Sequence, residues 1–278
     1  MADPQRLRAE LDVILELHES GEIEQALERC ETLAERTADV AADADPVQRE
    51  TAFAARFERA LLLTELGELD VAAQAYEQAA GVPVDDTDPD QRHETAMAML
   101  NRGICLDAVE EHEAALQAYE QLIARFADAE DPVTRDQVVR GRVNRAAALL
   151  ALERPAAAID AVEQIEAGLS RHDALDTEQL VLARRIAAAA TDTLQDPQAA
   201  VAVLDGLEPL TDDDPAVRVQ VIAARLEQAD LLAGDTAAAT DRLAEVLARY
   251  EEDPDPAVQE ALAAVRERLS DLRVSDAP

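Results

Sequence analysis

The chain contains no lysine and no tryptophan, and its 278 residues include only two cysteines, eight glycines and 2% aromatic residues. Without lysine it cannot form a phosphate-binding loop of the Walker type, and no GxGxxG or GxSxG motif is present. Cys30 and Cys105 have no CxxC spacing, so we expect two buried thiols and neither a disulfide nor a zinc knuckle. With so few glycines, the sequence has little of the turn chemistry that a β protein needs.

Basic charge is also scarce. Acidic residues outnumber basic residues 60 to 25, which gives a formal net charge of −35, and every basic residue is arginine. A field of this sign repels phosphate backbones and anionic lipids, so we expect no nucleic-acid partner and no membrane contact. No signal-like or membrane-length apolar run is present, which predicts a soluble cytoplasmic protein. The acidity fits either a GC-rich genome or a salt-adapted cell, and both origins stay open.

What the sequence does contain is helix formers and a repeated helix start. Hydrophobic residues make up 48% of the chain and are mostly Ala, Leu and Val, of which Ala and Leu strongly favour helices. Aspartate caps a helix and proline fits its first position, so each Asp-Pro pair predicts a helix start. Six of these pairs begin at Asp3, Asp45, Asp88, Asp131, Asp214 and Asp255, and the second, third and fourth of the six are 43 residues apart. A further start is expected near Asp176.

Small and large apolar residues recur with the same step inside the units. The corresponding positions are Ala60, Gly103 and Ala146, then Leu63, Leu106 and Leu149, then Ala72, Ala115 and Ala158, then Tyr76, Tyr119 and Val162. Small residues at fixed steps indicate close helix contacts, and the spacing within each unit has the helical period of 3.6. Breaks at Gly21, Gly67, Glu110–Glu111, Glu153–Pro155, Gln195–Pro197 and Gly234 divide each unit into two helices.

These patterns predict an all-α fold, a right-handed α-solenoid of about six antiparallel helix hairpins that spans residues 1–278 as a single domain. The expected hairpins are about 3–42, 45–84, 88–129, 131–170, 176–211 and 214–252, followed by a C-terminal capping helix over about 255–272. An end helix with a polar outer face is what a solenoid needs to close its core.

The pattern resembles the tetratricopeptide repeat (TPR) family. The matching segments are residues 101–106 (NRGICL), 113–122 (EAALQAYEQL), 66–79 (LGELDVAAQAYEQA) and 20–27 (SGEIEQAL). The family's usual period is about 34 residues, whereas here hairpin breaks are roughly 39 to 46 residues apart, which longer helices explain. The family's early tryptophan and hairpin-end proline are missing. A HEAT-like solenoid is the structural alternative.

No residue pattern indicates catalysis. The four histidines, His18, His93, His112 and His172, lie in different units and do not pair at helical spacing, so we expect solvated histidines on helix faces or loops. Zinc requires three or four converging ligands, and carboxylates without a dry cleft do not define an acid–base pair. We therefore predict no metal, no cofactor and no enzymatic activity.

Arginine is the unevenly distributed residue. Arg59, Arg102 and Arg145 recur at the 43-residue step, and the expected first helix of the fourth hairpin carries four arginines against Asp136 alone. The TPR resemblance implies that first helices line a concave groove that binds peptides. We therefore predict a groove for a peptide or anion formed by Asn101, Arg102, Arg140, Arg142, Asn144, Arg145, Arg184 and Arg185. The alternative is structural: the asparagines bond a neighbouring helix, and the arginines pair with acidic residues of the next hairpin.

The sequence thus predicts a non-enzymatic scaffold or adaptor whose concave groove binds a protein segment, and we expect that segment to be acidic or to bear a carboxylate. The first alternative is a sensor or regulatory module that binds a short peptide or small anion. The second is an enzyme with an unrecognised site.

Overall fold

The computed structural model describes residues 3–83, 85, 87–169, 174–207, 214–232 and 234–275. Within these ranges the chain forms thirteen α-helices and no β-strand, which confirms the all-α prediction. The helices are α1 (Pro4–Glu19), α2 (Ile23–Arg36), α3 (Pro46–Glu65), α4 (Leu69–Ala80), α5 (Pro89–Ala108), α6 (His112–Arg125), α7 (Pro132–Ala151), α8 (Pro155–Gly168), α9 (Ala174–Thr193), α10 (Pro197–Asp205), α11 (Pro215–Leu231), α12 (Thr236–Tyr250) and α13 (Pro256–Ser275).

The six Asp-Pro pairs named above all begin helices, namely α1, α3, α5, α7, α11 and α13. Asp196-Pro197 also begins a helix, α10, whereas Asp253-Pro254 does not. In each of the six pairs the aspartate side chain accepts a hydrogen bond from a backbone amide two or three residues further on, at 2.7–3.1 Å. These bonds satisfy amides that the first helical turn leaves without partners. The start expected near Asp176 differs, because α9 begins at Ala174 and Asp176 lies buried in its first turn.

The first five turns between first and second helices each contain a residue with positive φ. Glycine occupies this position at Gly21 and Gly67, with φ of 79° and 78°. Glu110, Glu153 and Gln195 occupy it in the next three hairpins, with φ of 63°, 57° and 66°. Glycine adopts this conformation freely, whereas other residues do so at a cost. All five turns lie at the breaks predicted from the sequence.

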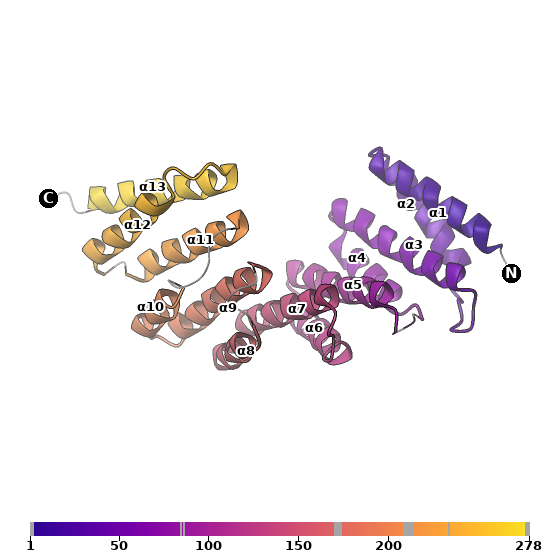
Figure 1. Ribbon diagram of the computed structural model, residues 1–278, viewed down its shortest axis with the longest axis horizontal. Coiled ribbons are helices and arrows are strands. Elements are labelled where there is room, and N and C mark those ends of the chain that lie inside the picture. Colours follow the sequence, from indigo (N-terminus) through magenta and orange to yellow (C-terminus); the bar gives the residue numbers. More distant parts are fainter. Residues whose placement is uncertain are drawn as a thin grey trace. The chain divides into compact units, whose positions relative to one another are not determined.

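The chain forms two compact units, Met1–Ala148 and Leu149–Pro278. In the first unit each helix from α1 to α5 packs on the next, and α1 also packs on α3 (Figure 1). In the second unit α9 packs on α8, α10 and α11, and α13 packs on both α11 and α12. A first helix therefore contacts its own second helix and a helix of a neighbouring hairpin, as stacked hairpins require.

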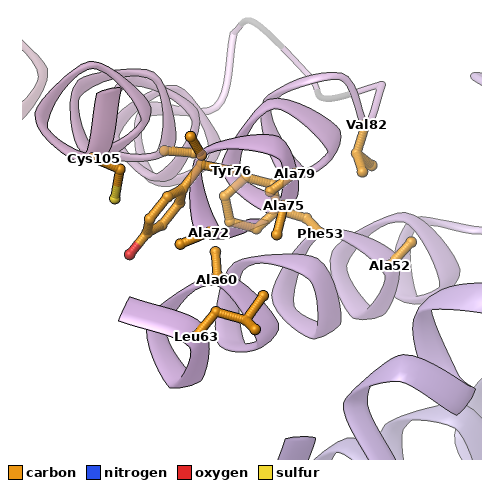
Figure 2. Close-up of a cluster of buried hydrophobic side chains, with 12 residues drawn as sticks. Ala52, Phe53, Ala60, Leu63, Ala72, Ala75, Tyr76, Ala79, Val82 and Cys105 are labelled. Carbon is orange, nitrogen blue, oxygen red and sulfur yellow. The ribbon is translucent and has the colours of Figure 1, made fainter. Parts of the chain in front are cut away.

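Figure 2 shows how small residues let the helices of the first unit approach closely. Ala60 on α3 and Ala72 on α4 are fully buried beside the ring of Tyr76, which is 2% exposed. Phe57 meets the Tyr76 ring edge-on with 5.5 Å between the ring centroids. In the next hairpin the contact is closer still, since a Cβ added to Gly103 would lie 2.2 Å from the ring of Tyr119. The small residues predicted from the 43-residue step therefore lie at helix contacts.

Helix α13 closes the hydrophobic core of the second unit. Its buried residues Val258, Leu262, Val265, Leu269 and Leu272 join a cluster that includes residues of α11 and α12. Its outward face carries exposed charged residues, among them Glu260, Glu267 and Asp271. An amphipathic end helix of this kind is the capping helix that the sequence predicted.

Candidate functional site

The two predicted asparagines lie against buried tyrosines of the preceding hairpin. Asn101 on α5 hydrogen-bonds Tyr76 of α4, and Asn144 on α7 hydrogen-bonds Tyr119 of α6. Tyr119 also donates its hydroxyl to Asp107 at 3.2 Å. The asparagines thus satisfy hydroxyl groups that would be costly to bury alone. This is the contact with a neighbouring helix that the structural alternative predicted for them.

The three arginines of the 43-residue step pair with second helices. The pairs are Arg59 with Glu31 of α2 at 3.7 Å, Arg102 with Glu77 of α4 at 3.0 Å, and Arg145 with Glu120 of α6 at 3.4 Å. The structural alternative expected partners in the next hairpin. Each carboxylate instead belongs to the preceding hairpin. The glutamates are more than half exposed, and such surface pairs contribute little stability, about 0–1 kcal/mol.

Arg140 and Arg142 on α7 form no hydrogen bond or ion pair with another described helix. The Arg140 side chain is 43% exposed and pairs with Asp136, one turn earlier on the same helix, at 2.9 Å. Arg142 is half-buried and has no hydrogen-bond or ion-pair partner among the residues that the structure describes. Neither guanidinium is held by another described helix, so both can take part in binding without first breaking a contact between helices.

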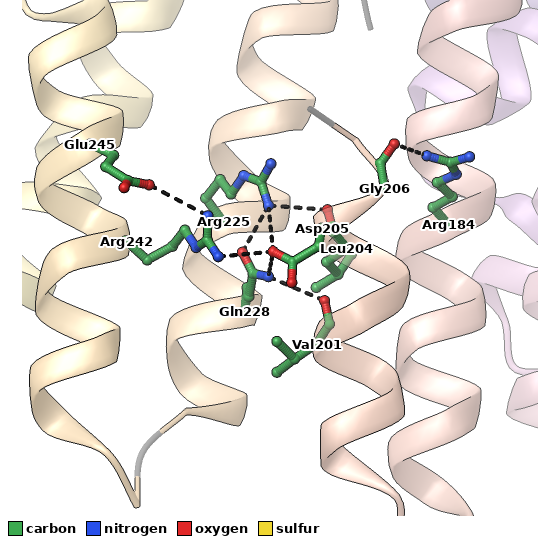
Figure 3. Close-up of polar contacts among 9 residues, drawn as sticks. All are labelled: Arg184, Val201, Leu204, Asp205, Gly206, Arg225, Gln228, Arg242 and Glu245. Atoms are coloured by element: carbon green, nitrogen blue, oxygen red, sulfur yellow. Dashed lines mark hydrogen bonds and ion pairs between the residues drawn. The ribbon is translucent and has the colours of Figure 1, made fainter. Parts of the chain in front are cut away.

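In the second unit Arg184 is part of the scaffold. It is 8% exposed, donates to Glu166 at 2.7 Å and also donates to the carbonyl of Gly206. Figure 3 shows it beside a partly buried network that joins α10, α11 and α12. There Asp205 accepts hydrogen bonds from the Gln228 amide at 2.8 Å and from Arg242 at 2.9 Å. Arg184 therefore supports packing and the backbone around Gly206.

Arg185, the next residue on α9, lines a pocket. It donates to both carboxylate oxygens of Glu227 on α11, at 2.5 to 3.1 Å, and to the amide oxygen of Gln220 at 2.5 Å. The pocket has a volume of about 390 Å³. Its lining includes one guanidinium against the carboxylates of Asp192, Glu227 and Asp230. Acidic side chains therefore outnumber basic ones in this pocket, whereas the sequence predicted that Arg185 helps to form a groove for a peptide or anion.

A positive pocket lies in the first unit, over α5. We call it the second cleft, because an equivalent first cleft, described next, precedes it along the chain. It has a volume of about 230 Å³ and is lined by Glu77, Ala80, Gly81, Met99, Arg102, Ala118, Gln121 and Arg125. Two guanidiniums face one carboxylate. Arg102 donates to Gln121 at 3.1 Å, and Arg125 donates to the carbonyl of Ala80 at 3.4 Å. Sequence reasoning missed Arg125, because it lies on a second helix outside the 43-residue arginine series.

A larger cleft occupies the equivalent place over α3. This first cleft, with a volume of about 580 Å³, is lined by Glu31, Ala34, Glu35, Ala38, Val40, Arg56, Arg59, Gln78, Gly81, Val82 and Pro83. Glu31, Arg59 and Gln78 correspond to Glu77, Arg102 and Gln121 of the second cleft. Each cleft thus lies over a first helix, between the second helices of two successive hairpins. Sequence reasoning did not single out Arg56 or Glu35.

His18 departs from the expectation that the histidines are solvated. It lies on α1 between two carboxylates of α3, with its Nε2 2.8 Å from Glu65 and its Nδ1 in contact with Glu58. Burial lowers the pKa of His18, but the hydrogen bonds to Glu65 and Glu58 and the charges of both residues outweigh burial and raise it. His112 likewise contacts a carboxylate, that of Asp107, at 2.9 Å. His172 lies outside the described residues.

Metal-binding clusters and membrane-spanning helices are both absent from the described part of the chain. No group of three or more His, Cys, Asp or Glu side chains there is placed to hold a metal ion. No described helix combines the length and apolar character that crossing a membrane would take. Cys30 and Cys105 are buried free thiols, and burial raises the pKa of Cys30 to about 12. Such a thiol is a packing residue and a poor nucleophile.

Comparison with known proteins identifies the fold. No protein-family model and no curated protein matches the sequence. Among solved structures, a Podosopora anserina kinesin light chain protein with nearly identical TPR-like repeats matches with a TM-score of 0.52 and 18% identity, over 82% of this chain and 98% of that one. The apo form of RapI matches with a TM-score of 0.55 and 11% identity, over 96% of this chain and 73% of its own. The fold is therefore a TPR-like helical solenoid.

Proposed function

We propose that this TPR-like protein is a non-enzymatic scaffold or adaptor that binds a carboxylate-bearing segment of another protein. The contacts would come from α5 and α7 of the first unit. The observation that carries the proposal is the charge of α7, which has four arginines against Asp136 in a chain of net charge −35. Because fold alone does not define function, the proposal rests on these residues and not on the solenoid.

The contacts that each guanidinium makes support the proposal of a carboxylate-bearing segment. Arg142 has no described partner, and Arg140 is held only by its own helix. Arg102 and Arg145 are held by exposed glutamates, which an incoming carboxylate can replace at little cost. The planar guanidinium holds a carboxylate with two parallel hydrogen bonds. The acidic remainder of the surface would repel anions that approach elsewhere, and this repulsion adds specificity.

The other residues of the predicted groove take supporting roles in this proposal. Asn101 and Asn144 fix the tyrosines on which α5 and α7 rest. In the second unit, Arg184 holds the Gly206 carbonyl, and Arg185 would contact a separate part of the partner after giving up its ion pair with Glu227. The experiments below therefore test the arginines of the first unit.

A fluorescent acidic peptide of alternating Glu and Leu, titrated with the full chain and followed by anisotropy, tests the proposal. Charged hydrogen bonds contribute about 1.5–3 kcal/mol each. The double variant Arg140→Ala/Arg142→Ala should therefore weaken binding tenfold or more and leave helicity unchanged. Binding should also weaken as salt is added.

The double variant Arg266→Ala/Arg268→Ala is the matched control, because both arginines lie on α13 in the second unit, where Arg266 bonds Gln259 and Arg268 pairs with Asp230. It removes the same two charges and should leave binding unchanged. Equal weakening by both changes would show that net charge alone governs binding. Tighter binding of the corresponding Lys–Leu peptide would overturn the assignment of a carboxylate-bearing partner.

A further inference from the structure

The first cleft differs from the second at the positions that decide which ligand it can hold. Both clefts share a glutamate–arginine pair, a glutamine and small alanines. At three equivalent positions they differ: Arg56 replaces Met99, Glu35 replaces Gly81, and Val82 replaces Arg125. The extra charges of the first cleft are therefore not a by-product of the repeat.

Arg56 is a buried cation with unused donors. Its side chain lines the first cleft, although the residue is only 9% exposed. Its Nη2 donates to the carbonyls of Thr37 at 2.7 Å and Ala38 at 3.2 Å, which holds the guanidinium at the end of α2. Its Nε and Nη1 form no hydrogen bond with the described residues, and no carboxylate pairs with it there. A buried charge without a counter-charge is costly, and a bound anion would remove that cost.

The rest of the lining supplies an opposite charge and apolar walls. Arg59 and Glu31 pair with each other at 3.7 Å. Glu35 has no partner among the described residues, so it is the carboxylate left available in the cleft. Val40, Val82 and Pro83 form apolar wall. The volume of about 580 Å³ falls in the range of small-molecule sites, roughly 300–1,000 Å³.

We propose that the first cleft binds a small zwitterionic molecule of dipeptide size. The ligand's carboxylate accepts hydrogen bonds from Arg56 and Arg59, its ammonium group donates to Glu35, and its side chains lie against the apolar wall. This site is separate from the arginines of α5 and α7 and does not rest on the proposed function. The two sites share no contact residue, so either can fail alone.

Isothermal calorimetry on the full chain tests the proposal with the dipeptides Leu-Leu, Val-Val and Ala-Ala. At least one should bind at millimolar concentration or below and raise the melting temperature. Its C-terminal amide lacks the carboxylate and its N-acetyl form lacks the ammonium, and each should bind at least tenfold more weakly. A longer peptide with the same C-terminal residues should resemble the N-acetyl form. Equal binding of that longer peptide would identify a protein terminus as the ligand and overturn the small-molecule proposal.

Variants then test which residue binds each charged end of the dipeptide. Arg56→Met copies the residue of the second cleft and should abolish dipeptide binding, whereas Arg102→Gln in the second cleft should not affect it. If Arg56→Met does not fold, Glu35→Gln gives an independent test on an exposed residue. It should weaken the dipeptide at least tenfold and leave the N-acetyl form unchanged. Failure of all three dipeptides to bind, or equal binding of the acid and the amide, would overturn the proposal.

Discussion

The first and second clefts are two versions of one repeated structure. Each lies over a first helix, α3 or α5, and each contains an arginine that pairs with a glutamate of the preceding hairpin. Their volumes differ, at about 580 and 230 Å³. The larger cleft contains a buried arginine, Arg56, where the smaller has Met99. The glutamate–arginine pair between successive hairpins therefore repeats, whereas several other residues that line the clefts vary.

This difference separates what the repeat maintains from what it leaves free. Helix contacts require a small residue facing a ring, so Ala60 with Tyr76 and Gly103 with Tyr119 recur at the 43-residue step. The positions that differ between the clefts border open space and take no part in the contacts between a small residue and a ring. They can change from one hairpin to the next at little cost to the fold, and this freedom makes them the places where binding properties can differ.

The largest effect is expected from the buried rings. Tyr76→Ala and Tyr119→Ala should each lower the free energy of unfolding by about 3–5 kcal/mol, because both remove a buried ring and leave a cavity. Tyr119→Phe keeps the ring and loses only the bonds to Asp107 and Asn144, about 0.5–1.5 kcal/mol. Urea denaturation measures all three. A loss below about 1 kcal/mol for either alanine variant would contradict the equivalence of the two contacts.

A smaller loss is expected from Gly103→Ala. The new Cβ would lie 2.2 Å from the Tyr119 ring and force it to shift. Overpacking costs about 1–3 kcal/mol, and the better helix propensity of alanine returns at most about 1 kcal/mol. Gly81→Ala is the control, since its nearest non-bonded atoms are 3.4 Å away. Urea midpoints should fall for the first variant and not for the second; the reverse order would contradict this account of the contact.

The contact between α1 and α3 should make the stability of the fold depend on pH. The pKa of His18 is raised above its ordinary value of 6.5 by Glu65 and Glu58, despite burial. The protonated contact therefore stabilises the fold fully below about pH 6.5, and this contribution is lost as pH rises through the raised pKa. The effect should be about 1 kcal/mol or less, because the pair is partly exposed. His18→Gln should flatten the dependence of the melting temperature between pH 6 and 8; an unchanged slope would show that other groups cause it.

The smallest effects concern the arginine–glutamate pairs shared by the clefts. Arg59→Gln and Arg102→Gln should each lower the free energy of unfolding by less than about 1 kcal/mol, and added salt should reduce the difference further. Measuring both changes at low and high salt compares the clefts directly. A loss of several kcal/mol at Arg102 alone would show that the second cleft depends on its ion pair for folding.

Local chemistry explains why so much of the fold could be predicted. An aspartate cap and the proline after it act within one helical turn, so six helix starts could be located from Asp-Pro pairs alone. Gly21 and Gly67 marked turns for the same reason, since their positive φ suits glycine. The 43-residue step of small residues and rings indicated that hairpins stack. Each of these signals depends on residues close in sequence or on a spacing that can be counted.

The candidate site could be predicted only in part, because the partner of a charged side chain depends on which helices meet. Arg184 and Arg185 are adjacent and looked alike in the sequence, yet one supports the Gly206 backbone and the other lines a pocket. Successive residues of a helix point about 100° apart, so stacking gives them different surroundings. The sequence by itself determined the helices, their caps and their repeat. Tertiary structure alone decided which arginines are tied to neighbouring hairpins, and it placed Arg56 and Glu35, which are far apart in the chain, in one cleft.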